Sequence, residues 1–333
     1  GMYMNVTTKL IAEKLGVSRI TVDRALNGRP GISEKKRKEV LAVAKAMGYR
    51  PHRLAQALVN GVSKSLGIIV FDLNNAFFAQ MVNAFQNAAF EAGYVTYIML
   101  TNKDPAVERS CLEHLLDRRV DGILLDSVVR EPEYADYLKS LNIPVITVMN
   151  RVSEDLPLVS IDDYRAMMDM TRYILSKGYR RVLYVCPPLY KAHLSNMSSL
   201  INRKGGFLKA ISEAPGDTEV LTLEDGDYMN TIGALRFRDE TRTAIICTSD
   251  IYAVTIMSSL HKRGLRPPMD YGLSGFDMIP MLHEFEPNIT TVSIFIQNIG
   301  IRCAQLLIDA INGGTLPPFV EMPYEIVPGQ TIL

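Results

Sequence analysis

The chain contains few cysteines and no pattern that would use them chemically. Its four cysteines, Cys111, Cys186, Cys247 and Cys303, stand far apart, with no Cys-x-x-Cys pair and no Cys/His cluster. At least three of them lie in apolar stretches, where a reduced thiol behaves as a small buried hydrophobic group. The sequence therefore predicts buried free thiols, and neither a disulfide framework nor a metal site.

Long apolar runs are also missing from the 333 residues. No run approaches the roughly 18–20 residues that a membrane-spanning helix needs. The N-terminus does not combine a basic segment with an apolar one, as a secretory signal does. We therefore expect a cytoplasmic protein with no membrane partner. At about 100–200 residues per domain, the length predicts two or three folding units.

Sequence patterns of the common enzyme classes are absent as well. No Gly-x-Gly-x-x-Gly follows the first predicted strand, and there is no phosphate-binding loop, Gly-x-Ser-x-Gly turn or metal-ligand spacing. The five histidines are scattered and give no convincing acid–base pair. We expect neither an enzyme nor a bound cofactor, and turnover of a ligand would contradict this expectation.

The net charge of zero conceals an uneven distribution of charge. Residues 1–60 contain twelve Lys and Arg against four Asp and Glu, a net charge of +8. The other 273 residues contain 24 basic and 32 acidic residues, a net charge of −8. A basic head on an acidic body indicates that the head binds a polyanion. A merely basic surface is the alternative that charge alone leaves open.

Three short helices are predicted in the basic head, at Lys9–Leu15, Arg19–Leu26 and Glu34–Met47, each preceded by a Ser or Thr that can cap it. Three residues, beginning with Gly16, join the first two helices, as in a helix-turn-helix. In that motif the N-terminal residues of the second helix enter the major groove. There an arginine of this helix, Arg19 or Arg24, can pair with a guanine edge, and Ile20 can contact a thymine methyl.

The head resembles the DNA-binding headpiece of the LacI/GalR repressors. The similarity is carried by Ile11-Ala12-Glu13-Lys14-Leu15-Gly16-Val17-Ser18 and Thr21-Val22-Asp23-Arg24-Ala25-Leu26-Asn27-Gly28, then by Ser33, Val40, Gly48-Tyr49, Pro51, Ala55 and Leu58. It extends, more loosely, along nearly the whole chain. The resemblance implies a bacterial transcription regulator, in most cases a repressor, that binds operator DNA as a homodimer. The DNA-contacting residues it implies are Thr7, Ser18, Arg19, Ile20, Thr21, Arg24, Asn27, Arg29, Ala55 and Leu58.

The resemblance also implies a hinge helix within residues 51–61. In the family this helix orders on DNA, pairs with its dimer mate and wedges a leucine, here Leu58, into the minor groove. Such a wedge unstacks a base step and bends the duplex. A tether with one exposed leucine is the alternative.

Asp23 departs from the family pattern, which usually has Ser at this position. Phosphates repel a carboxylate, so Asp23 should not replace a serine–phosphate contact. Asp23 can accept a hydrogen bond from a cytosine amino group, or it can orient Arg19 or Arg24 through an ion pair on the helix surface. We therefore predict an altered operator preference. The nearby run Lys35-Lys36-Arg37-Lys38 predicts either phosphate contacts or a solvated helix face.

From residue 66 onward, short apolar runs alternate with helical patterns. Strands are predicted at Leu66–Phe71, Val95–Leu100, Gly122–Leu125, Val145–Met149, Val182–Cys186, Val220–Leu223, Ala244–Thr248 and Gly272–Phe276. Helices are predicted near 76–92, 106–118, 163–177, 204–214, 250–263 and 295–312. This alternation indicates parallel sheets covered on both faces, and the length of the body suggests two lobes.

The resemblance implies the same fold class: a small all-α helix-turn-helix headpiece, then an α/β effector domain of two doubly wound parallel-sheet lobes, like periplasmic binding proteins. The implied headpiece is 1–50, the hinge helix 51–61 and the effector-binding and dimerisation domain 62–333. One lobe takes 62–161 and 291–322, and the other takes 162–290 and 323–333, with crossovers near 161, 291 and 322. Ligands bind at the carboxyl ends of strands in such sheets.

The segments that follow the strands supply the predicted effector contacts. By resemblance, Phe77 and Phe78 form an aromatic pair over the pocket, Arg203 belongs to an Arg-x-x-Gly-Phe element that binds the effector, and Tyr228 places a ring against it. The other predicted contacts are Asn150, Ser249, Asp250 and Asp277. Several of these residues have an alternative role that involves no ligand. The phenylalanines can belong to the core, Arg203 can form a surface ion pair, and Asp277 can cap a turn.

An aromatic face, a forked arginine donor and polar acceptors suit a hydroxyl-rich ring, so we predict a sugar-like effector. A purine-type corepressor and a solute-binding module without DNA function are the alternatives. After Val292 the family often has Arg/His-Gln-Pro, whereas this chain has Ser293-Ile294-Phe295. One polar contact is therefore expected to be missing. We expect the effector to alter DNA binding by a coupling of ~1–3 kcal/mol, of either sign.

Overall fold

The computed structural model describes residues 5–189 and 195–333. Contacts divide the chain into two units, residues 1–63 and 64–333. The first four residues of the predicted headpiece lie outside the described residues, as do residues 190–194 ahead of Arg203.

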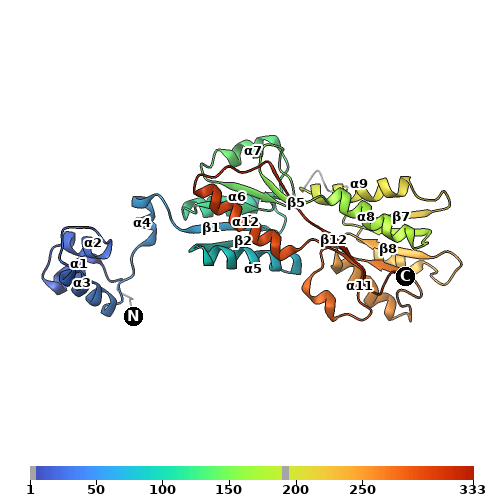
Figure 1. Cartoon of the computed structure of the whole chain (residues 1–333), viewed down its shortest axis with the longest axis horizontal. Helices are drawn as coiled ribbons and strands as arrows, with labels where there is room; N and C mark the ends of the chain where they lie inside the picture. Colours follow the sequence, from blue (N-terminus) through green and yellow to red (C-terminus); the bar gives the residue numbers. More distant parts are fainter. Residues whose placement is uncertain (1–4, 190–194) are drawn as a thin grey trace. The chain divides into compact units, whose positions relative to one another are not determined.

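The first unit is entirely helical, with α1 (Thr8–Leu15), α2 (Arg19–Leu26), α3 (Glu34–Ala46) and α4 (Arg53–Asn60) (Figure 1). The hydroxyls of Thr7, Ser18 and Ser33 each accept a backbone N–H from the first turn of the helix that follows. The core between α1, α2 and α3 is centred on three fully buried side chains, Ile11, Val22 and Val40. The predicted helix-turn-helix is confirmed.

The second unit is built on two parallel sheets. The six-stranded sheet has the order β11 (Phe319–Met322), β5 (Leu158–Ile161), β4 (Val145–Val148), β3 (Gly122–Leu125), β1 (Ser65–Val70), β2 (Val95–Leu100). The four-stranded sheet has the order β7 (Glu219–Leu223), β6 (Arg181–Val185), β8 (Thr243–Cys247), β9 (Gly272–Ser274). Every neighbouring pair in both sheets is parallel, so the predicted fold class is confirmed.

Helices connect and cover these strands. The first lobe carries α5 (Ala76–Glu91), α6 (Pro105–Asp117), α7 (Pro132–Lys139) and α12 (Ile296–Ile311). The second carries α8 (Asp163–Ser176), α9 (Ser198–Ser212), α10 (Tyr228–Ala234), α11 (Asp250–His261) and the 3₁₀ helix η2 (Pro280–Glu284). The most extensive helix–helix contacts are α8 with α9 and α12 with α5. Each lobe therefore has its own helical layer, and both sheets share one continuous apolar core.

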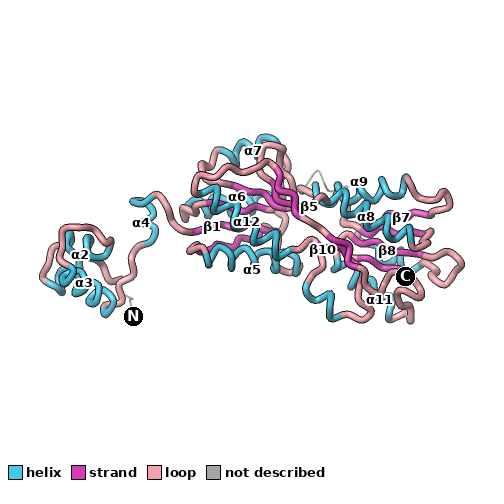
Figure 2. Tube along the Cα trace, in the orientation of Figure 1, coloured by secondary structure: helices cyan, strands magenta, loops and turns pink. Residues whose placement is uncertain are grey.

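The chain crosses between the lobes three times: from β5 into α8, from β10 (Thr291–Ser293) into α12, and from β11 into β12 (Glu325–Val327). β10 and β12 pair antiparallel, and Figure 2 shows them between the lobes. The sequence patterns did not predict β5, β10, β11, β12, α7 or α10. The two central crossover strands are only three residues long, and β11 is an edge strand with an alternating, half-exposed pattern.

The four cysteines are buried and unpaired, which confirms the predicted free thiols. Within the two described stretches of the chain, no helix is both long enough and apolar enough to cross a membrane.

Candidate functional site

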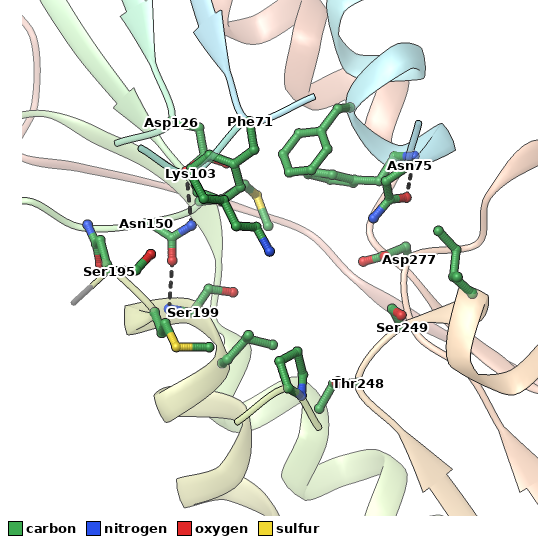
Figure 3. A pocket seen from close by; sticks show the side chains of 18 of the residues that line it. Phe71, Asn75, Lys103, Asp126, Asn150, Ser195, Ser199, Thr248, Ser249 and Asp277 are labelled. Atoms are coloured by element: carbon green, nitrogen blue, oxygen red, sulfur yellow. Dashed lines mark hydrogen bonds between the residues drawn. The ribbon is translucent and has the colours of Figure 1, made fainter. Parts of the chain in front are cut away.

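A cavity of about 520 Å³ lies where the carboxyl ends of strands from both sheets converge. Its walls come from the segments after β1, β3 and β4 in one lobe and after β6, β8 and β9 in the other (Figure 3). This volume falls in the range of small-molecule sites. The predicted effector residues that line it are Phe77, Phe78, Asn150, Arg203, Ser249 and Asp277.

Arg203 projects from the second turn of α9, and its guanidinium is held by the protein on several sides. Its Nε donates to Asp163 Oδ1 at 2.8 Å, and its Nη1 donates to the Thr248 carbonyl at 2.7 Å. The guanidinium also lies 3.8 Å from the centre of the Phe276 ring. Burial and the ion pair with Asp163 fix the Arg203 guanidinium in one orientation. Arg203 thus forms a buried ion pair at the cavity wall, and the alternative prediction of a surface ion pair is wrong.

Asp277 approaches the same guanidinium from the end of β9, with Oδ1 3.9 Å from Arg203 Nη2. Its backbone has φ 109°, a conformation that residues other than glycine rarely adopt. A backbone hydrogen bond from its N–H to the Val292 carbonyl, 2.9 Å long, holds it there. Backbone strain of this kind persists only where the surroundings enforce it, and it is common at ligand sites. Burial raises the pKa of Asp277 well above its usual value.

Asn150, at the end of β4, links the two lobes across the cavity. Its Nδ2 donates to Asp126 Oδ1 at 2.9 Å in its own lobe, and its Oδ1 accepts the Ser199 N–H of the other lobe at 3.1 Å. Figure 3 shows these three groups in one chain of hydrogen bonds. Both the amino group and the oxygen of the Asn150 amide are therefore hydrogen-bonded to protein groups. Asn150 connects the two lobes.

The start of α9 is fastened to the first lobe by further hydrogen bonds. The Asn196 N–H donates to the Val128 carbonyl at 2.6 Å, and its side-chain Nδ2 donates to the Arg151 carbonyl at 3.0 Å. In the opposite direction, the Arg151 N–H donates to Ser198 Oγ at 2.8 Å. Residues 196–199 therefore form a clasp, defined by these bonds and the Asn150–Ser199 bond, that closes one side of the cavity.

Asp126 lines the cavity although no sequence pattern pointed to it. It follows β3 and is 1% exposed, and among the described residues only Asn150 donates a hydrogen bond to its carboxylate, at Oδ1. Burial raises its pKa from 3.8 to about 8, while Asn150 and Lys103 act in the opposite direction. An Asp-Ser pair after an apolar strand is also typical of an ordinary turn, which is why the sequence alone did not reveal this group.

Glu108 in α6 is a second buried carboxylate that the sequence did not reveal. It is fully buried and accepts hydrogen bonds from Ser127 Oγ at 2.8 Å and the Val128 N–H at 2.7 Å. Tyr134 donates a third. Burial raises the pKa of Glu108 despite these donors. Because Ser127 and Val128 follow Asp126 directly, Glu108 fixes the loop that aims Asp126 at the cavity.

Aromatic side chains cover the first-lobe side of the cavity. Phe77 and Phe78 are 6% and 8% exposed and meet edge to face with their ring centres 5.0 Å apart. Phe71 packs on Phe78 at 5.4 Å in the same manner. These rings line the cavity and also belong to the core, so the core alternative is confirmed and their contact with an effector stays a prediction.

Two predicted effector residues lie outside the cavity lining. Asp250 is fully buried, and its carboxylate accepts from Thr291 Oγ1 at 2.6 Å and from the Ile279 N–H at 2.8 Å, so it anchors a crossover strand. Tyr228 packs edge to face on Tyr252, 5.3 Å between ring centres, and Tyr252 is the ring that lines the cavity. Ser293, Ile294 and Phe295 are also outside the lining, and the missing polar contact stays a prediction.

The raised pKa of Asp126 predicts a pH-dependent stability. The folded pKa of about 8 exceeds the unfolded value, so the folded state retains a proton that the unfolded state releases. Stability is therefore lost as the pH rises from about 4 towards 8. Asp126→Asn removes this loss, and we expect its stability advantage over the wild type to grow by about 1–3 kcal/mol between pH 5 and pH 8.

Urea unfolding of both proteins at each pH measures this difference. Asp117→Asn, an exposed carboxylate at the end of α6, is the control and should show no such trend. An Asp126→Asn advantage that is constant with pH would contradict the buried-carboxylate interpretation.

The exposed face of the helix-turn-helix carries most of the predicted DNA contacts. Arg19, Arg24, Asn27 and Arg29 are exposed, and Ile20 is 64% exposed although it is apolar. On α4, Leu58 is 60% exposed and Ala55 is also exposed. Thr7, Ser18 and Thr21 take part in capping α1 and α2.

Asp23 pairs with a partner that the sequence analysis did not consider. Its Oδ2 accepts from Arg29 Nη1 at 3.0 Å, and its Oδ1 accepts from Asn27 Nδ2 at 2.7 Å. The expected orientation of Arg19 or Arg24 is therefore wrong, because the chain turns back after α2 and brings Arg29 beside the carboxylate. Asn27 Oδ1 in turn accepts from Gln56 of α4 at 3.3 Å.

The basic run of α3 includes one residue, Arg37, with a role that was not predicted. Arg37 donates from Nη1 to the Arg24 carbonyl at 2.9 Å and from Nη2 to the Arg29 carbonyl at 2.8 Å, so it satisfies the end of α2. Lys36 pairs with Glu39 at 2.9 Å. Lys35 and Lys38 are exposed and stay available for phosphate contacts.

Comparison with known proteins gives matches over both units. Residues 7–52 match the family described as bacterial regulatory proteins, lacI family, and residues 63–324 match periplasmic binding proteins and sugar binding domain of LacI family. The HTH-type transcriptional repressor PurR of Mannheimia succiniciproducens is 28% identical over 92% of each chain.

Two solved structures are similar over much of the chain. The lac repressor dimer bound to operator and the anti-inducer ONPF is 20% identical, with a TM-score of 0.81 over 98% of this chain and 99% of that one. A periplasmic binding protein/LacI transcriptional regulator from Alkaliphilus metalliredigens in complex with D-xylulofuranose is 26% identical, with a TM-score of 0.68 over 81% and 99%. Since the matched families together span nearly the whole chain, the protein belongs to the LacI family of bacterial regulatory proteins.

Proposed function

We propose that the protein represses transcription by binding an operator as a homodimer, and that a hydroxyl-rich small molecule in the cavity controls this binding. One observation carries the proposal: the chain joins an exposed, basic helix-turn-helix face to a domain whose cavity has a buried arginine at the strand ends. The relatives support both halves, because one is a lac repressor bound to operator and another holds D-xylulofuranose.

Each part of the chain has its own role in this proposal. Residues 1–50 form the DNA-reading headpiece, 51–61 the hinge helix, and 62–333 the effector and dimerisation domain. Within the last, 62–161 with 291–322 and 162–290 with 323–333 make the two lobes. Leu58 is the minor-groove wedge, which its 60% exposure on α4 supports, since an apolar side chain in water gains from insertion between bases.

The homodimer is supported by an apolar surface on the first lobe. Edge strand β2 exposes Val95, Tyr97, Ile98 and Leu100 by 36–45%, and Phe90 of α5 is 67% exposed. Exposed apolar patches on edge strands mark association surfaces. The lac repressor, which shares this fold, is a dimer in its operator complex.

The effector lies against the residues that the cavity brings together. Phe77 and Phe78 give it an apolar face, and Arg203, Asp277, Asn150 and Ser249 surround its polar edge. Ligand binding then favours one arrangement of the two lobes, and a coupling of ~1–3 kcal/mol alters operator affinity 5–150-fold.

Arg24→Ala tests the DNA-binding half. We expect operator affinity, for a site selected from random DNA, to fall by ~1–3 kcal/mol, because a bidentate arginine–guanine contact is lost, while affinity for random DNA is unchanged. Fluorescence anisotropy at fixed salt measures both. Arg263→Ala, an exposed arginine after α11, is the matched control. Equal loss on both DNAs would instead make Arg24 a phosphate contact.

Asp23→Ser tests the operator preference. Removing the carboxylate releases Arg29, which should then contact a phosphate, so the slope of log affinity against log salt should steepen by about 1. We also expect selection from a random pool to return different operators. An unchanged slope together with the same operators would show that the Asp23–Arg29 pair has no part in recognition.

A further inference from the structure

Helix α4 has few interactions of its own that would keep it folded. It is eight residues long, and a helix of that length is not stable alone in water. Its N-cap residue, His52, makes no side-chain hydrogen bond. A cavity of about 270 Å³ separates α4 from the end of α2, and it is lined by Ala55 and Val59 of α4 and by Leu26 of α2. Close apolar packing therefore does not hold this face of α4 against the helix-turn-helix.

Among the side chains that the structure describes, one hydrogen bond joins α4 to the helix-turn-helix. Gln56 Nε2 donates to Asn27 Oδ1 at 3.3 Å. Asn27 is the C-cap residue of α2, and its backbone N–H donates to the Asp23 carbonyl at 3.0 Å. An amide presents an acceptor at one end and a donor at the other. The bond to Gln56 Nε2 therefore forms only while Asn27 presents its oxygen to α4.

Asp23 determines which end of the Asn27 amide faces α4. Asn27 Nδ2 donates to Asp23 Oδ1 at 2.7 Å and to the Asp23 carbonyl at 3.1 Å. An ionised carboxylate only accepts hydrogen bonds, so the amino group faces Asp23 and the amide oxygen faces Gln56. Arg29 Nη1 donates to Asp23 Oδ2 at 3.0 Å and holds the carboxylate in this position. A serine hydroxyl both donates and accepts, so it would not impose this orientation on the amide.

We propose that Asp23 is a positioning residue that, through the Asn27 amide, holds α4 as a helix against the end of α2 before DNA is bound. Less conformational entropy is then lost when the protein binds DNA, because α4 is already ordered. Leu58 is also held in a fixed position relative to the exposed residues of α2. The inference goes beyond the proposed function, because it concerns the protein without DNA. It rests on that function only where it gives α4 a role at the operator.

Hydrogen exchange of the full chain without DNA, followed by mass spectrometry, tests the proposal. The backbone N–H groups of Gln56 and Gly61 make hydrogen bonds of α4, and such groups exchange slowly while the helix is ordered. We expect residues 56–61 of the wild type to exchange more slowly than an unstructured chain. Asp23→Ala should raise their exchange rate roughly 2- to 10-fold, the effect of losing about one hydrogen bond, with no change in α1 or α3.

Two outcomes of this measurement would overturn the proposal. In the first, residues 56–61 of the wild type exchange at the rate of an unstructured chain, which would mean that α4 is not ordered before DNA binds. In the second, the wild type and Asp23→Ala exchange equally in this segment, which would mean that the carboxylate does not hold the helix.

Two control variants separate the effect of the Asn27 amide from a general effect of charge. Glu39 of α3 is 47% exposed, against 46% for Asp23, and has an ion pair of its own, so Glu39→Ala controls for the loss of an exposed carboxylate. Arg29→Ala removes the ion pair of Asp23 but leaves the Asn27 amide in place. Neither should accelerate exchange of residues 56–61 by more than about twofold. Acceleration equal to that of Asp23→Ala in either control would overturn the role of the amide.

A double-mutant cycle on operator affinity gives an independent measurement. Gln56→Ala should weaken binding to an operator selected from random DNA roughly 2- to 10-fold, but it should have little further effect in the Asp23→Ala background. Additive effects would overturn the coupling between Asp23 and Gln56. If the protein selects no operator at all, the DNA-binding half of the proposed function fails, and the exchange measurement still decides whether Asp23 orders α4.

Discussion

Arg203→Ala should lower the free energy of unfolding of the effector domain by about 3–5 kcal/mol and abolish the response to the ligand. The stability loss follows because Asp163, 4% exposed, and Asp277, 6% exposed, would remain buried without a counterion. Loss of the ligand response follows because the substitution removes the guanidinium that orients the effector. Operator binding should persist below the melting temperature, because Arg203 is not part of the headpiece unit.

Arg172→Ala is the matched control for the first of these effects. Arg172 also forms an ion pair, with Glu213 at 2.6 Å, but its side chain is 45% exposed, and exposed pairs contribute ~0–1 kcal/mol. Chemical unfolding followed by circular dichroism compares the two variants. Asp163→Asn, added to Arg203→Ala, should recover part of the loss, because it removes a stranded charge. Wild-type stability for Arg203→Ala would show that the ion pair is unimportant for folding.

Gly206→Ala should destabilise the protein by about 3 kcal/mol or more. A Cβ at Gly206 would lie 1.9 Å from the Tyr164 carbonyl oxygen and 3.0 Å from the Met168 nitrogen, both of which belong to the backbone of α8. Backbone atoms cannot rotate aside, so α9 would have to move away from α8. That movement would also lengthen the contact between Arg203 on α9 and Asp163 on α8. We therefore expect weaker ligand binding as well.

Gly205→Ala, one residue earlier in the same helix, is the control. Its Cβ would meet only the Tyr164 ring, at 3.1 Å, and that side chain is 41% exposed and free to rotate. Because alanine favours helix more than glycine by up to ~1 kcal/mol, this variant should be neutral or slightly stabilised. Thermal unfolding of the two alanine variants decides between close helix packing and a general need for flexibility. Equal losses would contradict the packing explanation.

Local signals explain why most of the fold was predictable. Each headpiece helix begins beside a Ser or Thr whose hydroxyl caps it, so the caps and the helix pattern coincide within a few residues. The inner apolar strands β1, β3, β4, β6, β8 and β9 are buried along nearly their whole length and were predicted within one or two residues at each end. Elements whose pairing depends on distant residues were not predicted: β10 forms its ladder with β12, more than thirty residues later.

The candidate site was only partly predictable, for the same reason. Helix α9 was expected from 204 but begins at Ser198, and its N-cap residue, Met197, makes no side-chain hydrogen bond. Its first turn is held by Asn150 from the other lobe. Asp126 and Glu108 gain their roles from burial and from partners on other elements, which no short pattern records. The Asp23–Arg29 pair spans six positions, beyond the spacing of a helix-surface pair.

The clasp formed by residues 196–199 has a consequence for the kinetics of regulation. An effector that enters or leaves past this wall has to break several hydrogen bonds at once, including those of Asn196 with Val128 and Arg151 and that of Ser199 with Asn150. For an effector that takes this route, we expect exchange to be paced by opening of these hydrogen bonds and not by diffusion of the small molecule. With exchange slowed in this way, we expect the regulator to respond to a sustained level of its effector and to average over brief fluctuations in concentration.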